Sequence, residues 1–157
     1  MARHYLGIDV GTGSARAGLF DDTGGLVATD KADIQMWREA GDIVEQSSED
    51  IWDSVCRSVR GALKKAGVAP DAVAGIGFDA TCSLVVLGEG GKPLAVGPSG
   101  DPARNIIVWM DHRAADQAKR INRTGDKVLD YVGGQISPEM ETPKLLWLSE
   151  NMPATFA

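Results

Sequence analysis

The chain has 157 residues, of which 43% are hydrophobic and 24% charged, and it carries a net charge of -6. Such a composition is that of a soluble globular domain, and the length suffices to bury a core without disulfide or metal staples. The acidic balance excludes a basic surface for nucleic acid or an anionic membrane, and no apolar run is long enough to cross a bilayer. Because no signal-peptide core precedes the first strand, we expect a cytoplasmic protein.

The first part of the chain predicts strands followed by a helix. Three strand-like segments, residues 4–9, 15–20 and 26–30, are separated by turn residues and predict an antiparallel meander. A looser segment with no predicted element follows. A helix is predicted over residues 48–66, because acids occupy its first turn, apolar residues recur on one face, and Gly67 stands where a C-terminal cap belongs.

The tip between the first two strands, Asp9 to Ser14, joins a carboxylate to a glycine-rich turn. Glycine lets the backbone approach a ligand closely, so the N–H groups of Thr12, Gly13 and Ser14 can converge on phosphate oxygens. Asp9 can hold Mg2+ directly or through water. An ordinary β-turn with local hydrogen bonds explains the same six residues equally well, because short motifs often match by chance.

The second part of the chain alternates strands and helices. Strands are predicted at residues 73–78, 84–87 and 106–109, and helices at about 113–123 and from Thr142 onward. In the last helix, Thr142 is expected to be the N-cap and Pro143 the first helical residue. Together with the meander, these elements predict an α/β fold with a mixed sheet flanked by helices.

Polar side chains gather after two of these strands, where ligands collect in an open sheet. The first cluster contains Asp79, Thr81, Cys82 and Ser83, and the second contains Trp109, Asp111 and Arg113. Hydroxyls and carboxylates can bind a polyol, and an indole face suits the apolar side of a sugar. A polar turn explains the first cluster as well, and a core tryptophan beside a helix-capping aspartate explains the second.

Two common nucleotide-binding motifs are excluded. The glycines of Gly75-Ile76-Gly77 lie inside a strand that leads to another strand, so they do not form a dinucleotide-binding turn before a helix. A P-loop is absent, because no GxxxxGK[ST] pattern occurs. If the chain uses ATP, it binds the nucleotide in another way.

Five segments in order resemble the N-terminal half of an FGGY-type carbohydrate kinase, in the superfamily of actin, hexokinase and the heat-shock ATPases. They span essentially the whole chain and comprise residues 7–16, 44–52, 75–77, 109–113 and 142–147. The resemblance implies an actin-like (ribonuclease H-like) ATPase fold for residues 1–157. It also implies ATP-dependent phosphorylation of a sugar or polyol hydroxyl, with ATP and Mg2+ as cofactors.

The resemblance assigns roles by position. Asp9 is expected to organise the Mg2+ of MgATP, with Arg16 near the phosphates, although Arg16 taken alone fits a solvent-facing residue. Two further groups are implied: Thr12, Gly13 and Ser14 in the phosphate loop, and Asp79, Thr81, Cys82, Ser83, Trp109, Asp111 and Arg113 around the sugar. The catalytic base and most of the adenosine pocket are expected beyond Ala157. The isolated chain is therefore expected to be inactive.

The expected substrate is a pentulose or pentitol. Glycerol kinases carry a Gln-Arg-Glu run where this chain has Thr81-Cys82-Ser83, which resembles the branch that phosphorylates ribulose or ribitol. The expected partners are the sugar or polyol and a C-terminal domain. Homodimer formation is left open. Neither nucleic acid nor a membrane is expected as a partner. The alternative function is a non-catalytic actin-like or heat-shock-like nucleotide-binding module. A third option is an inactive remnant, which predicts an exposed apolar face.

Overall fold

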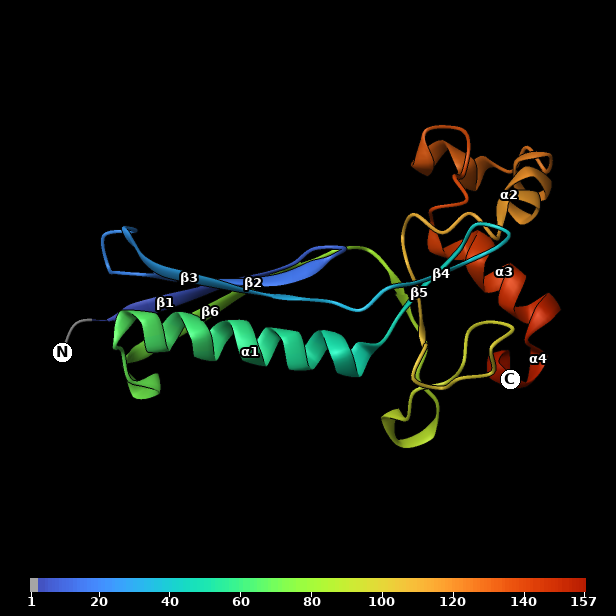
Figure 1. The fold of residues 1–157 in the computed structure, drawn as a ribbon. Coiled ribbons are helices and arrows are strands. Elements are labelled where there is room, and N and C mark those ends of the chain that lie inside the picture. The colour runs from blue at the N-terminus through green and yellow to red at the C-terminus, as the bar shows by residue number, and fades with distance from the viewer. Residues whose placement is uncertain (1–2) are drawn as a thin grey trace. The chain divides into compact units, whose positions relative to one another are not determined.

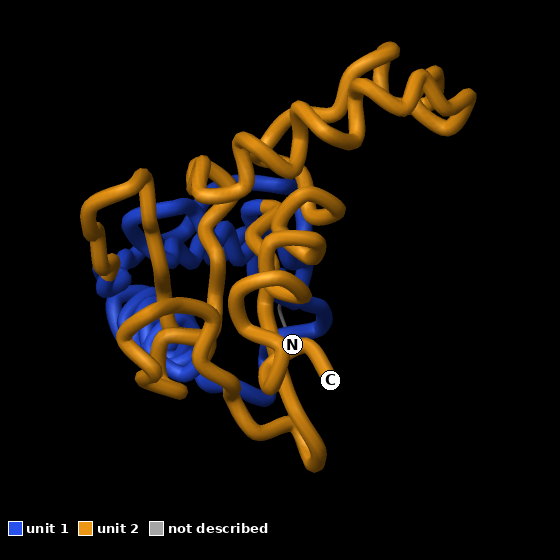
Figure 2. The backbone as a smooth tube through the Cα atoms, turned by 90° about the vertical axis from the view of Figure 1, so that its right-hand side faces the viewer, with its two compact units in different colours: residues 1–35, 49–81 blue, residues 36–48, 82–157 orange. Residues whose placement is uncertain are grey.

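The computed structural model describes residues 3–157, so Met1 and Ala2 lie outside the described residues. The chain divides into two compact units (Figure 2). Unit 1 comprises the N-terminal residues to Gln35 together with Glu49–Thr81, and unit 2 comprises Met36–Ser48 and Cys82–Ala157. Each unit has its own four-stranded sheet and its own buried apolar cluster.

Unit 1 contains a mixed sheet with the strand order β3-β2-β1-β6 (Figure 1). Its strands are β1 (His4–Val10), β2 (Ser14–Phe20), β3 (Leu26–Asp33) and β6 (Val73–Ala80). The first three form the predicted antiparallel meander, and β6 pairs parallel to β1. The long helix α1 (Ser48–Ala66) precedes β6, as parallel pairing requires a crossover connection.

One face of this sheet is covered by α1 (Figure 1). Alternate residues of β1 and β2 are buried, among them Ile8 and Ala17, and they pack with Val55 and Ala62 of the helix. The predicted helix over residues 48–66 is confirmed, and so is its cap: Gly67 has a φ of 66°, and its N–H donates to a carbonyl of the last turn. The intervening residues of β1 and β2 project from the opposite face of the sheet and are less buried.

Unit 2 contains an antiparallel sheet with the strand order β4-β5-β8-β7. Its strands are β4 (Trp37–Glu39), β5 (Ile43–Gln46), β7 (Leu84–Val85) and β8 (Ile106–Ile107). Its helices are α2 (Ala115–Asn122), α3 (Glu141–Asn151) and α4 (Pro153–Phe156). Short 3-10 helices span Pro70–Ala72 in unit 1 and Glu89–Gly91 and Lys127–Val132 in unit 2. Of the helices described, none is both long and apolar enough for a membrane span.

The structure corrects several predicted elements of unit 2. Strands β4 and β5 were not predicted, because β5 buries polar Glu45 and Gln46 and so lacks an apolar pattern. The strands predicted over residues 84–87 and 106–109 are only two residues long.

The start of the last helix was also predicted wrongly. The N-cap of α3 is Met140 rather than Thr142, and the helix begins at Glu141. Pro143 is therefore not the first helical residue. It is tolerated in the first turn because the N–H groups there have no partner within the helix.

The pairing of α2 with α3 predicts an acid-sensitive contribution to stability. Glu150 of α3 accepts hydrogen bonds from Arg120 and Gln117 of α2, and these partners hold the pKa of Glu150 below its usual value of 4.5. A carboxylate with a depressed folded-state pKa stabilises the fold above its unfolded-state pKa and loses that contribution as the pH falls through the folded value. We expect Glu150→Gln to lower the urea midpoint at neutral pH, and to lower it progressively less below pH 4.5.

The control for Glu150→Gln is Asp116→Asn, which removes an exposed pair with Lys119 on α2. Urea unfolding curves of the two variants, measured at neutral and acid pH, test the assignment. A deficit for Glu150→Gln that stays constant across the acid range would contradict it.

Candidate functional site

Unit 1 aligns three charged residues across neighbouring strands. The strand register pairs Asp9 of β1 with Arg16 of β2 on one side and with Asp79 of β6 on the other. Directly paired residues project from the same face of a sheet, here the face opposite α1. Arg16 Nε lies 3.2 Å from Asp9 Oδ2, and about half of each side chain is exposed. The open face therefore presents a carboxylate and a guanidinium to solvent.

The hairpin tip beside these residues is held by its backbone. Gly11 N–H donates to the Ser14 carbonyl at 3.1 Å, and the Gly13 carbonyl accepts from Ile34 N–H at 3.0 Å. A Cβ added at Gly11 would collide with the guanidinium of Arg16 in its observed position, so a larger residue there would require the end of the Arg16 side chain to move. A Cβ at Gly13 would meet nothing within 4 Å. The hairpin is confirmed, and phosphate binding by Thr12, Gly13 and Ser14 stays a prediction.

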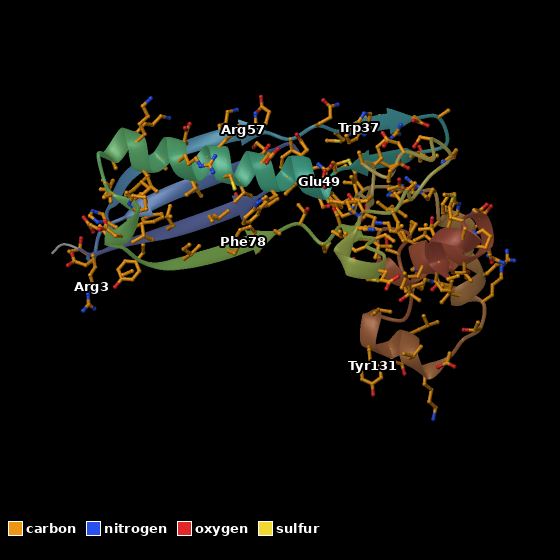
Figure 3. All side chains as sticks on the ribbon, turned by 90° about the horizontal axis from the view of Figure 1, so that it is seen from below. Arg3, Trp37, Glu49, Arg57, Phe78 and Tyr131 are labelled. Carbon is orange, nitrogen blue, oxygen red and sulfur yellow. The ribbon has the colours of Figure 1, made fainter. Side chains whose placement is uncertain are left out.

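A hollow of about 540 Å³ lies on the same face of unit 1. Asp9, Arg16 and Asp79 line it together with apolar residues such as Phe20 and Leu26. Phe78 of the edge strand β6 (Figure 3) also borders it, although its paired residue, Ile8, faces α1. The hollow is wide open to solvent, and its walls are mostly apolar with a few polar groups. The charged row thus borders a space that can accommodate a ligand.

The donor set of this face fits a Mg2+ ion that is also bound by phosphate oxygens. Among residues 3–157 no group of three or more His, Cys, Asp or Glu side chains could hold a metal by itself. Protein sites usually hold Mg2+ with one or two carboxylates plus substrate phosphates and water. Asp9 and Asp79 supply two carboxylates, and Arg16 supplies a guanidinium suited to phosphate.

In unit 2, Asp111 and Arg113 bind each other inside the fold. Both side chains are almost fully buried, with exposed fractions of 0% and 2%. Arg113 Nε and Nη2 lie 2.9 and 2.8 Å from Asp111 Oδ2, which also accepts from Val44 N–H at 2.6 Å. Arg113 Nη1 donates to the Val96 carbonyl at 2.8 Å. The observed partners of both residues are protein groups, and their contact with a sugar stays a prediction.

The Asp111–Arg113 pair continues into a row of alternating charges. Arg113 Nη2 donates to Glu45 Oε1 at 2.9 Å, and the other carboxylate oxygen of Glu45 lies 2.8 Å from Arg104 Nε in an ion pair without hydrogen-bond geometry. Arg104 also pairs with Glu39 at the exposed end of the row. Sequence reasoning assigned no role to Glu45 or Arg104, because their segments lacked a predicted element.

Trp109 is held on both sides of its backbone. Its N–H donates to Ser83 Oγ at 3.1 Å, and its carbonyl accepts from Lys144 Nζ at 3.0 Å. Lys144 is fully buried and was also missed, although Pro143-Lys144 interrupts the apolar pattern of its helix. Cys82, next to Ser83, is exposed.

The predicted sugar residues belong to both units. Asp79 and Thr81 lie in unit 1, and the rest lie in unit 2, namely Cys82, Ser83, Trp109, Asp111 and Arg113. Within unit 2 the structure brings Ser83 to Trp109 and Arg113 to Asp111.

Curated proteins similar to this chain are described as carbohydrate kinase domain-containing proteins or as a sugar kinase. An FGGY carbohydrate kinase domain-containing protein of Xenopus laevis is 51% identical over 149 residues, which are 95% of this chain and 27% of that protein. Its human counterpart is 50% identical over 96% of this chain and 27% of its own length. A D-ribulokinase of Saccharomyces cerevisiae is 48% identical over 98% of this chain and 22% of its own length. The chain thus spans about a quarter of the length of these relatives.

Solved structures share the fold. A xylulose kinase from Rhodospirillum rubrum aligns with a TM-score of 0.79 at 21% identity, over 98% of this chain and 30% of that one. A glycerol kinase from Plasmodium falciparum, solved with ADP, aligns with a TM-score of 0.68 at 18% identity, over 98% of this chain and 30% of its own. The predicted α/β, actin-like fold is confirmed. Residues 4–157 match the FGGY family of carbohydrate kinases, N-terminal domain, and the chain therefore belongs to that family.

Proposed function

We propose that the full-length protein transfers the γ-phosphoryl group of ATP to a hydroxyl of a pentulose or pentitol, and that residues 1–157 form its N-terminal domain. The observation that carries this proposal is the row of Arg16, Asp9 and Asp79 on the open face of unit 1, beside a glycine-rich hairpin tip. Phosphoryl transfer needs little covalent chemistry from the protein, and catalysis rests on positioning and on charge stabilisation.

The residues of unit 1 have distinct roles in this proposal. Asp9 holds the metal of MgATP, the N–H groups of Thr12, Gly13 and Ser14 donate to phosphate oxygens, and Arg16 faces the phosphates. Mg2+, when bound, neutralises charge that develops on the transferring phosphoryl group. The proton of the sugar hydroxyl passes to a base that we place beyond Ala157.

The sugar assignment is supported by the relatives. The D-ribulokinase is 48% identical to this chain, whereas a glycerol kinase of Thermococcus gammatolerans is 32% identical. This chain has Thr81-Cys82-Ser83 where glycerol kinases carry a Gln-Arg-Glu run, which also favours a pentulose or pentitol over glycerol. We propose that these residues, with Asp79, Trp109, Asp111 and Arg113, border a five-carbon sugar or polyol.

A second domain is supported by an exposed apolar surface on unit 1. Ile76 and Phe78 of the edge strand β6 are 66% and 56% exposed. Apolar side chains gathered in this way are typical of a surface that another domain covers. We propose that a C-terminal domain of the full-length protein covers this surface and supplies the catalytic base. We also propose that the protein works in the cytoplasm.

The test is an ADP-release screen of the full-length protein against ribulose, xylulose, ribitol, hexuloses and glycerol. We expect turnover with a pentulose or pentitol, and none by the 157-residue chain, because the proposal assigns the base to the C-terminal domain. Robust ADP release by the short chain would contradict the assignment of the catalytic base to the C-terminal domain. ATP binding without turnover of any sugar would instead favour a non-catalytic nucleotide-binding module.

A further inference from the structure

Lys144 occupies an unusual position for a lysine, since this side chain is almost never fully buried unless it is paired. It is 0% exposed, and its Nζ donates to three backbone carbonyls: Val108 at 3.0 Å, Trp109 at 3.0 Å and Glu139 at 2.8 Å. An ammonium group has three donors, so all three are used. Burial lowers the pKa of Lys144, an effect that the nearby Asp111 and Glu141 carboxylates oppose.

The three acceptors belong to two separate segments. Val108 and Trp109 follow β8 and lead to Asp111, and Glu139 lies just before α3. Lys144 itself projects from the first turn of α3, so a single side chain ties this helix to the segment that carries Trp109.

The peptide groups around Trp109 are held from both sides. Ser83 Oγ accepts from the Trp109 N–H at 3.1 Å, and Lys144 Nζ donates to the Trp109 carbonyl at 3.0 Å. The preceding residue is held as well, since Val108 N–H donates to the Val44 carbonyl at 3.0 Å. Fixed backbone groups at consecutive residues set the direction in which the Trp109 side chain leaves the chain, and that side chain is half buried.

Packing alone does not require a lysine at this position. Burying an ammonium group carries a desolvation cost, and apolar residues of similar volume often stabilise a buried site equally well or better. A methionine would fill similar space without that cost but could not hold the Trp109 carbonyl. The geometry therefore favours a role in orientation.

We infer that Lys144 is a positioning residue for substrate recognition, which fixes Trp109 through its main-chain carbonyl so that the indole presents one face to the sugar. Ser83 is the second support, acting on the N–H of the same residue. The inference rests on the proposed function, because it takes Trp109 to be part of the sugar site.

The test uses the full-length protein with Lys144→Met, and with Lys119→Met as the matched control on an exposed lysine of α2. With the sugar that wild type turns over fastest, we expect Lys144→Met to raise the KM for sugar and to lower kcat/KM on the order of 100-fold, as small misplacements of positioning groups do. The KM for ATP should stay at the wild-type value. Lys119→Met should change neither.

A second measurement does not depend on activity. Hydrogen exchange of the backbone over residues 106–112 should become faster in Lys144→Met and stay unchanged in Lys119→Met. If Lys144→Met does not fold, Lys144→Gln decides, because its neutral amide keeps at most two of the three donors at the same position. It should raise the KM for sugar and leave that for ATP unchanged.

Different failures have different meanings. A wild-type protein that phosphorylates no sugar overturns the proposed function, and the exchange measurement then decides whether Lys144 fixes the Trp109 segment. A variant with unchanged sugar KM and unchanged exchange overturns the inference about Lys144. A loss of kcat alone, with both KM values unchanged, also overturns it and leaves Lys144 a structural role.

Discussion

Replacing Glu45 by glutamine is expected to lower the free energy of unfolding by about 3–5 kcal/mol, the cost typical of breaking a buried ion pair. The Glu45 side chain is 0% exposed and lies between Arg113, which is 2% exposed, and Arg104, which is 10% exposed. Glutamine keeps the shape but removes the charge, so two guanidinium groups lose the carboxylate between them. Asp111 still pairs with Arg113, but Arg104 is left with only its partner at the exposed end of the row.

Tryptophan fluorescence during urea unfolding is a suitable measurement. The guanidinium carbons of Arg104 and Arg113 lie 5.5 and 5.0 Å from the ring centroids of Trp37 and Trp147, so two of the fluorophores report on this network. The control is Glu39→Gln, which removes the partly exposed carboxylate at the end of the same row. We expect a smaller loss for Glu39→Gln, because the Glu39 side chain is 40% exposed and Arg104 keeps Glu45 as a partner. Equal losses in the two variants would show that burial of Glu45 does not matter.

Replacing Asp9 by asparagine is expected to reduce kcat of the full-length protein about 1,000-fold. A bound metal contributes several kcal/mol of charge stabilisation in the transition state, and each 1.36 kcal/mol corresponds to about a factor of ten in rate. Asparagine cannot supply the anionic oxygen that we assign to the metal of MgATP. The fold should persist, because the Asp9 side chain is half exposed and its pair with Arg16 is solvated.

ADP release, measured over a Mg2+ titration, tests the role of Asp9. The control is Asp33→Asn, which removes a more exposed carboxylate from β3, the outer strand of the same sheet. We expect wild-type kcat for Asp33→Asn, and wild-type thermal stability for both variants. An Asp9→Asn enzyme with normal kcat would refute the assignment of the metal, and one that unfolds would show a structural role for this carboxylate.

Most of unit 1 could be predicted because its signals are local. The alternation of β1 and β2, the turn glycines between them, and the helical periodicity and Gly67 cap of α1 each act within a few residues. The candidate phosphate tip is visible in the sequence for the same reason. The segment of β4 and β5 lacked such signals, since β5 buries Glu45 and Gln46 against partners that lie far away in the chain.

The sequence by itself determined the family resemblance, the strand–turn–strand motif with Asp9 at its tip, and the long helix that covers the sheet. Only the tertiary structure decided the register that pairs Asp9 with Arg16 and Asp79, and the burial of Glu45 and Lys144. Glu45 meets Arg113 across 68 positions, and Lys144 meets Val108 across 36. Turn chemistry and periodicity depend on neighbours in the chain, whereas a charge is stable inside a protein only when long-range packing brings it to its partner.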